Sequence, residues 1–241
     1  MTLASDNTSR PEILQVSRTA QYHTVEELFK RGHADSVYYT LLLLSAVIVA
    51  TGLLINNATI VLGGMLVTPL LSPILIIALG MATGEMHAIH SSLFLVLKSI
   101  SIVVGVSFAL ALLLGDRAFD LSVFGYAENL EILYFIVAFT SGIAATFAWA
   151  HKEVADILPG VAVAVSLVPP LSAIGISLRS FNGDVFQQAF VIFIFNFVGV
   201  ILGSLVVFSL LKFQKTEQLV HAEAQATEKK SENKTENSTK S

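Results

Sequence analysis

The sequence is short of charge and contains no cysteine. Only 13% of its residues are charged and 54% are hydrophobic, whereas soluble domains carry roughly 25% charged residues. The charges are rare between Val37 and Leu211 and frequent in the flanking segments. Without cysteine the chain can form neither disulfides nor thiolate metal sites. A net charge of -4 gives no indication of a nucleic-acid partner.

The apolar region divides into six stretches, each long enough to cross a bilayer as a helix. They are Val37–Ile55, Ala58–Ala82, Ser91–Leu114, Glu131–Ala150, Val154–Leu178 and Val185–Leu211. Barrel strands are excluded because they would be shorter and would alternate in polarity. The expected fold class is therefore an all-α integral membrane protein with about six transmembrane helices.

The two halves of this region share an order of features. Val67–Ser72 resembles Leu167–Ser172 at an offset of one hundred residues, and Gly84-Glu85 recurs as Gly183-Asp184. Each half reads as a span, a proline-broken span, a Gly–acid turn and a span. Two three-helix units of this kind predict inverted repeats with a broken second helix. If the proline segments are instead re-entrant hairpins, each unit crosses twice and the repeats are parallel.

The expected domain organisation follows from these boundaries. Repeat 1 covers 37–114, a connecting loop covers 115–130 and repeat 2 covers 131–211. A polar tail, 1–36, precedes the repeats, and a polar, largely disordered tail, 212–241, follows them. In the first tail, Thr24 and Glu27 form a capping-box pattern that predicts a short interfacial helix, although a simple extension of the first span would fit as well.

The distribution of Lys and Arg predicts the orientation. With six spans both tails lie on one side. That side carries Lys30, Arg31, Lys152, Lys212 and Lys215, and the other carries Arg117 and Arg179. By the positive-inside rule we expect a protein of the cell (inner) membrane with both termini in the cytoplasm.

The two proline-containing motifs together resemble the signature of a known family. The stretches Val61–Ile74 and Gly160–Leu171 are similar to the conserved segments of the family called domain of unknown function 389. The resemblance covers roughly residues 37–211. It implies a hydrophobic multi-pass membrane fold and, because the family is uncharacterised, no substrate.

The proline breaks are the predicted substrate-binding site. Proline lacks an amide donor and frees the carbonyl four residues earlier, so the carbonyls of Met65, Pro69, Val165 and Ser166 would lack helical partners. Ser72 and Pro73 also form a helix-start pattern, with Ser72 as N-cap. Hydroxyls and prolines of the predicted site are Thr68, Pro69, Ser72, Pro73, Ser166, Pro169, Pro170 and Ser172. The alternative is that the prolines only kink two packed helices.

Two polar residues inside expected spans are further candidates. Lys98 either reaches outward to the interface or has a function inside the membrane. Asn196 lies at a comparable place in the last span and favours an inward position for both. Three glycines are expected to allow close helix packing or an unwound stretch: Gly63, Gly64 and Gly160.

Several short polar segments are expected to serve as turns. Asn56-Asn57 fits the turn between the first two spans. Gly84-Glu85 and Gly183-Asp184 each fit a helix C-cap followed by an acidic N-cap, with carboxylates at pathway mouths as the alternative. His87 and His90, beside Glu85, fit a solvated turn better than a metal site.

These features predict a secondary transporter or channel for a small solute or ion. The alternative is a membrane scaffold or sensor whose repeats serve oligomer assembly. No catalytic residue set, metal site or cofactor motif occurs, so we do not expect an enzyme. The expected partners are the lipid bilayer, a small solute or ion and further copies of the chain in a homo-oligomer.

Overall fold

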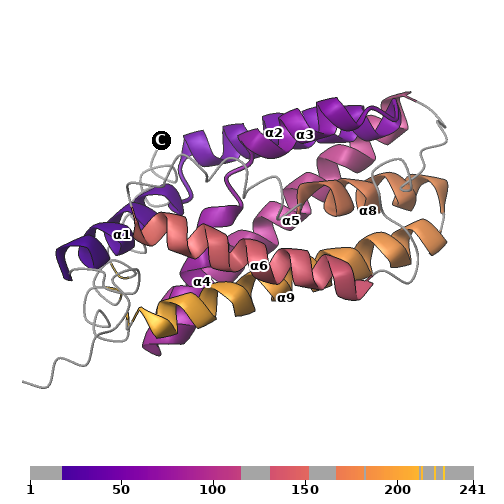
Figure 1. Cartoon of the computed structure of the whole chain (residues 1–241). Coiled ribbons are helices and arrows are strands. Elements are labelled where there is room, and N and C mark those ends of the chain that lie inside the picture. The colour runs from indigo at the N-terminus through magenta and orange to yellow at the C-terminus, as the bar shows by residue number, and fades with distance from the viewer. Residues whose placement is uncertain are drawn as a thin grey trace, which may run out of the picture.

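A computed structural model describes residues 18–114, 131–151, 167–181 and 183–211, together with residues 213, 220 and 225. These parts of the chain are helical and contain no strand (Figure 1). The helices are α1 (Arg18–Arg31), α2 (Ser36–Leu54), α3 (Ala58–Val67), α4 (Leu71–Thr83), α5 (Met86–Leu114), α6 (Glu131–Ala150), α8 (Val168–Ser180) and α9 (Gly183–Leu210).

Four described helices are long and apolar enough to cross a membrane: α2, α5, α6 from Ile132 onward, and α9. The pair α3 and α4 makes a fifth if its two parts form one span, since the chain bends there by 56°. Of the fifth expected stretch, the structure describes the part from Leu167 onward, in which α8 begins. The all-helical fold class is confirmed, and the described residues contain four to five apolar helices long enough to cross a membrane.

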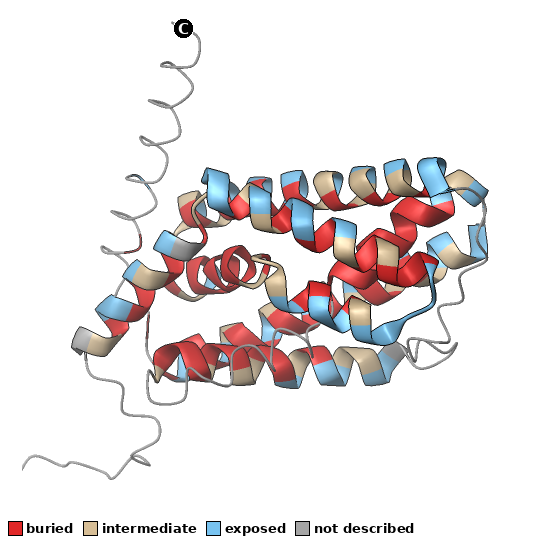
Figure 2. Ribbon diagram, turned by 90° about the horizontal axis from the view of Figure 1, so that it is seen from above, coloured by how far each residue is buried: buried red, intermediate tan, exposed pale blue. Residues whose placement is uncertain are grey.

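Two short helices, α4 and α8, occupy the centre of the bundle. Each packs against both α5 and α9, and α8 also contacts α2 and α3. Residues Ser72–Gly80 of α4 and Val168–Ser177 of α8 are all buried (Figure 2). A helix that is apolar on every side is buried in a protein core or in lipid, and here the neighbours of α4 and α8 are other helices. The outer positions are taken by α2 with α3 and by α6 with α9.

The contact between α6 and α9 depends on small residues. A Cβ atom added to Gly142 would meet the backbone of Val200, and one added to Gly203 would meet the backbone of Phe139. Gly199 and Gly203 lie four residues apart on one face of α9, the spacing that lets membrane helices approach closely. Ser204 Oγ also donates a hydrogen bond of 3.2 Å across the contact to the Gly142 carbonyl.

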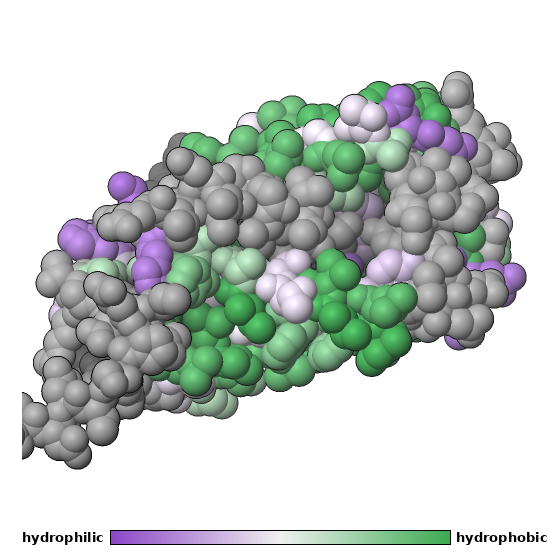
Figure 3. All heavy atoms as spheres, viewed as in Figure 1, coloured by the Kyte–Doolittle hydropathy of each residue, from purple (hydrophilic) through white to green (hydrophobic). Residues whose placement is uncertain are grey.

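The outer surface of the bundle is apolar. On α9 the exposed side chains follow one stripe that includes Phe190, Ile194, Val198, Leu202 and Val206. Figure 3 shows hydrophobic residues across the middle of the visible face and hydrophilic ones toward its two ends. A surface of this kind would be unfavourable in water and is suited to lipid.

The N-terminal helix begins earlier than the capping box predicts and packs onto the bundle. Thr24 lies inside α1, where its hydroxyl donates to the Ala20 carbonyl at 2.8 Å and to the Trp149 carbonyl at 3.3 Å. The capping-box prediction is therefore wrong. Val25 and Leu28 are completely buried, so this face of α1 contacts protein rather than the membrane surface. Most of the tail after α9 lies outside the described residues.

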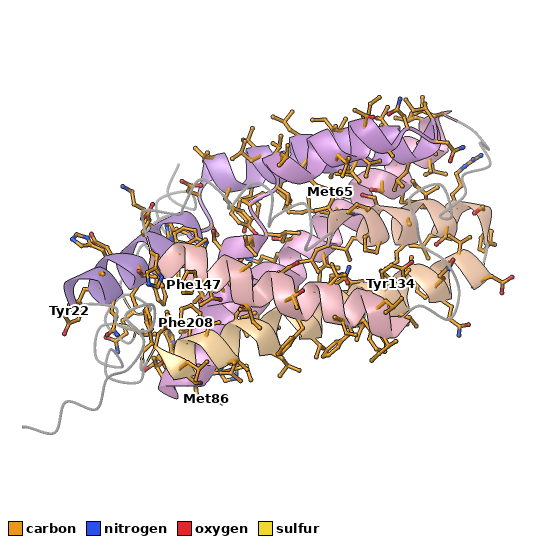
Figure 4. All side chains as sticks on the ribbon, viewed as in Figure 1. Tyr22, Met65, Met86, Tyr134, Phe147 and Phe208 are labelled. Atoms are coloured by element: carbon orange, nitrogen blue, oxygen red, sulfur yellow. The ribbon has the colours of Figure 1, made fainter. Side chains whose placement is uncertain are left out.

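Labelled residues show the direction of the long helices. In Figure 4, Met86 at the start of α5 and Phe208 near the end of α9 lie at one end of the bundle. On α6, Tyr134 lies toward the opposite end and Phe147 lies toward the end of Met86. The chain thus runs in opposite directions along α5 and α9, and α6 runs the same way as α9.

Candidate functional site

The first proline break is formed by three residues between α3 and α4. Thr68 has φ -72° and ψ 133°, the extended conformation that a following proline favours. Its amide donates to the Met65 carbonyl at 3.3 Å. The interruption of the helix at Pro69 is as predicted, but the prediction that the Met65 carbonyl would be left free is wrong.

The start of α4 differs from the predicted helix start. Leu70, not Ser72, is the N-cap, and no side chain caps the helix. Ser72 and Pro73 are its second and third residues. In a first turn the amides have no partner inside the helix. Pro73 therefore breaks no hydrogen bond there, and the prediction that it frees the Pro69 carbonyl is wrong.

The start of α8 has the same construction. Leu167 is the N-cap, no side chain caps the helix, and Pro169 and Pro170 lie in the first turn. The predicted site residue Ser166, and Val165 before it, lie outside the described residues, as does Gly160. We call α4 and α8 the half-helices. The chain runs outward along both, toward Met86 in α4 and toward the start of α9 in α8 (Figures 1 and 4). Their uncapped first turns are therefore the ends that lie inside the bundle.

Three buried hydroxyls have no hydrogen-bond partner in the described part of the chain: those of Thr68, Ser107 and Ser172. Two of them, Thr68 and Ser172, belong to the predicted site. A buried polar group without a partner costs roughly 1–3 kcal/mol, so such groups call for a ligand or water. Ser72, also predicted, is 8% exposed.

The long helices α5 and α9, which pack against α4 and α8, add polar groups to the same core. Ser107 of α5 lies against Gly175 of α8, whose added Cβ would be 2.8 Å from the Ser107 Cβ. Ser99 Oγ and the Tyr38 hydroxyl are 2.8 Å apart and hydrogen-bonded. Asn196 of α9 is 4% exposed, so its predicted inward position is confirmed.

Ser99 and Ser107 were missed by the sequence reasoning. The signal was present, because Ser92, Ser99 and Ser107 recur at seven and eight residues on the buried face of α5. That spacing keeps them on one side of a helix. Because serine is common in membrane helices, this spacing alone does not indicate a functional site.

Lys98 does not lie with the buried polar residues inside the bundle. Its side chain is exposed on α5, and Nζ lies 4.5 Å from the centre of the Phe94 ring. The prediction of an inward position is therefore wrong for Lys98. The adjacent residue Ser99 is the one that faces inward.

The predicted glycines divide into two groups. Gly64 is close-packed, since an added Cβ would lie 2.6 Å from Val49 Cγ2, and Ser45 donates to its carbonyl at 2.8 Å. Gly63 has no atom within 4 Å of such a Cβ, so the close-packing prediction is wrong for it. Both lie inside α3 and are not unwound.

Two turn predictions in the first half of the chain are confirmed, those for Asn56-Asn57 and Gly84-Glu85. The prediction that His87 and His90 lie in a solvated turn is wrong, because both residues lie in α5. Asn56 has φ 52°, and the Asn57 side chain caps α3 by accepting from the Ile60 amide. Gly84 is the left-handed C-cap of α4, and Glu85 accepts from the His87 amide at the start of α5.

In the second half the prediction for Gly183-Asp184 is wrong. The C-cap of α8 is Phe181, with φ 50°, and Gly183 already begins α9. The two Gly–acid pairs look alike in the sequence but have different positions in the structure. A Gly–acid pair fits both the end of one helix and the first turn of the next.

The polar groups inside the bundle are the hydroxyls of Thr68, Ser107 and Ser172, the Asn196 side chain and the first turns of α4 and α8. Hydroxyls, an amide side chain and two helix N-termini can hold an anion or a carbonyl group. Among the described residues no cluster of three His, Cys, Asp or Glu could hold a metal ion.

Comparison with known proteins places the chain in a family without assigning an activity. It is 22% identical over 173 residues to an uncharacterized protein of Methanocaldococcus jannaschii, across 70% of this chain and 52% of that protein. The chain thus spans about half the length of this relative. No solved structure matches it. The model of the family described as domain of unknown function (DUF389) matches residues 65–202, more than half of the chain. The chain belongs to this family.

Proposed function

We propose that the protein is a secondary transporter or channel for a small solute or ion, whose site lies between the first turns of α4 and α8. The observation that carries the proposal is the pair of half-helices that begin inside the bundle without side-chain caps. Each presents the positive end of a helix dipole. The amides of Leu71 and Ser72 in α4 and of Val168 in α8 have no partner inside their helix, whereas the first-turn prolines carry no amide hydrogen. An anionic or carbonyl-bearing solute would satisfy these amides.

The unpartnered hydroxyls support the same location. Ser172 lies one turn into α8, and Thr68 is the C-cap of α3. Helices α3 and α8 are in contact. Groups of this kind are costly in a dry membrane interior unless something binds them. Asn196 of α9 adds a buried amide beside these helices.

A recurring set of helix features supports an inverted repeat. α4 and α8 begin at Leu71 and Val168, 97 residues apart. The same interval separates Pro73 from Pro170 and the left-handed caps Gly84 and Phe181. The sequence match at one hundred residues is thus three residues, nearly one helical turn, out of register with the helices.

The buried faces of α5 and α9 follow the same interval of 97 residues. Ser92, Leu95, Val96, Ser99, Val103, Ser107 and Ala111 correspond to Ala189, Ile192, Phe193, Asn196, Val200, Ser204 and Phe208, and all are buried. The opposite directions of α5 and α9 fit two copies inserted in opposite orientations. The 56° bend between α3 and α4 favours a broken span over a re-entrant hairpin, which would need to reverse direction. Transporters with broken helices commonly use such repeats.

The orientation remains the one that the positive-inside rule predicts. Both tails would face the cytoplasm across the cell membrane. The proposed site does not depend on this orientation, since it lies between two half-helices that enter from opposite ends of the bundle.

Because the natural chain has no cysteine, single cysteines can report on water at the site. We expect Ser172→Cys to react with a small, membrane-impermeant methanethiosulfonate reagent in proteoliposomes. Asn57→Cys, in an exposed turn, is the reactive control. Ser45→Cys, buried and packed between α2 and α3, is the unreactive control. A Ser172→Cys protein as inert as Ser45→Cys would overturn the proposed site.

Transport itself is tested by uptake of labelled chloride, phosphate and acetate into proteoliposomes. Uptake of at least one probe should exceed that of empty vesicles and fall about tenfold when Thr68→Val and Ser172→Ala are combined, as expected for lost hydrogen bonds to a charged solute. Ser101→Ala, which changes an exposed hydroxyl on α5, is the matched control. No uptake of any probe, together with loss of a homo-oligomer in the same variant, would favour the scaffold.

A further inference from the structure

Lys98 is a charged group on a surface that should face lipid. It lies twelve residues from the start of α5, which corresponds to about 18 Å along the helix. No described residue forms an ion pair with it, and its recorded contact is with the Phe94 ring. A cation at such a place is costly unless an anion accompanies it.

A cavity of about 410 Å³ surrounds this lysine. It lies between the end of α1, the turn at 32–35, and helices α2, α4 and α5. Its polar lining is basic or neutral: His33, Tyr39, His87, His90, Ser91, Ser92 and Lys98. No carboxylate is among the described residues that line the cavity. The cavity thus offers hydrogen-bonding groups beside the Lys98 ammonium group, which has no ion-pair partner among the described residues.

The remaining walls of the cavity are apolar. Phe29, Ile76 and Leu95 line its inner part. Phe94, which also lines the cavity, is 60% exposed, and Leu97 on the same helix is 52% exposed. A polar pocket that continues into an exposed apolar strip fits a molecule with an anionic head and a hydrocarbon tail.

The lysine side chain points toward the end of the helix where a lipid headgroup would lie. Phe94 is four residues nearer to Met86 than Lys98, so the ammonium group is drawn one turn toward that end. Long basic side chains reach toward the interface in this way. His87 and His90 lie further along the same helix and extend the polar lining in that direction.

We propose that this cavity is a binding site for an anionic phospholipid, with Lys98 as the ion partner of its phosphate. Basic pockets between membrane helices on the side of the positive loops bind anionic headgroups. The site is separate from the first turns of α4 and α8. It therefore stands even if the transport proposal fails.

The full-length protein in nanodiscs tests the proposal. Replacing phosphatidylcholine by phosphatidylglycerol should raise the midpoint of thermal unfolding by about 3 °C or more. Lys98→Gln should abolish this rise, whereas Lys98→Arg should keep it. Lys30→Gln removes an exposed cation on α1 that does not line the cavity, and it should leave the rise unchanged.

Three results would overturn the proposal. One is an equal rise in wild type and Lys98→Gln. Another is loss of the rise in Lys30→Gln to the same extent, which would indicate general charge attraction. The third is an equal stabilisation of wild type by inorganic phosphate in phosphatidylcholine nanodiscs, which would indicate a soluble anion. If Lys98→Gln does not fold, His90→Gln replaces it and should reduce the rise.

Discussion

Gly84 and Phe181 end matching helices in the two halves, yet one is glycine and the other is aromatic. Both adopt left-handed backbone angles, with φ 78° and 50°, and both donate to a carbonyl four residues back. Only glycine adopts this conformation without steric cost. The backbone of the two halves is thus more alike than their sequences, and the second half tolerates strain that the first avoids.

The largest expected difference between the halves is in how their outer helices pack. Gly203→Ala should destabilise the protein by about 2–3 kcal/mol, because its Cβ would meet the Phe139 backbone, which cannot yield. Gly64→Ala should cost less, since its nearest neighbour is the tip of the Val49 side chain. Thermal unfolding in detergent measures both.

Gly63→Ala is the control for this pair. It adds a methyl group where no atom lies within 4 Å and should stabilise the helix by up to about 1 kcal/mol. Equal losses for Gly203→Ala and Gly64→Ala would show that the two interfaces are equally close.

Substitutions at the two left-handed caps should have opposite signs. Gly84→Ala should cost about 1 kcal/mol, because alanine is strained at φ 78°. Phe181→Gly should gain about 0.5 kcal/mol, because it relieves strain and the side chain, 94% exposed, loses no packing. Thermal midpoints of the two variants check the signs, and a loss of stability in Phe181→Gly would contradict the comparison.

Matching serines of the long helices α5 and α9 should also respond differently. Ser204 Oγ donates to Gly142, so Ser204→Ala should cost about 1 kcal/mol. Ser107 occupies the matching place in α5 without a described partner. Ser107→Ala should therefore raise the unfolding free energy by about 1 kcal/mol or more, because it removes an unsatisfied buried hydroxyl. A loss of stability in Ser107→Ala would reveal a bound water or ligand at that hydroxyl.

The smallest effect is expected where the halves are most alike. Pro73→Ala and Pro170→Ala each change the third residue of a half-helix. Each should alter stability by less than about 1 kcal/mol, since a first-turn proline breaks no helical hydrogen bond. Chemical denaturation of the two variants measures the change in unfolding free energy. A large effect of only one substitution would show that the two prolines are not equivalent.

Hydropathy alone was sufficient to predict the long helices. The ends of α2, α5, α6 and α9 lie within five residues of the expected stretches, because a bilayer requires long apolar helices. The proline break was predictable for the same local reason. The N-cap of α4 was not, since Ser72-Pro73 is an equally good helix start two residues later.

The position of each polar side chain could be predicted only in part. Thr68 and Ser172 were chosen for their nearness to proline, and both hydroxyls are buried without a described partner. Ser107 was missed, and the sequence left the direction of Lys98 open between outward and inward, because membrane helices such as α5 are apolar on most of their surface. Apolar periodicity then gives little guidance on which face packs inward.

The sequence and the tertiary structure determine different features of the two proline-containing halves. The sequence by itself determined that the chain is helical, apolar and broken at Pro69, since composition and proline chemistry act locally. Only the tertiary structure decided that α4 and α8 begin 97 residues apart rather than one hundred, and that both pack against α5 and α9. Register and neighbours depend on how side chains fit between helices, and that fit is not contained in any single segment.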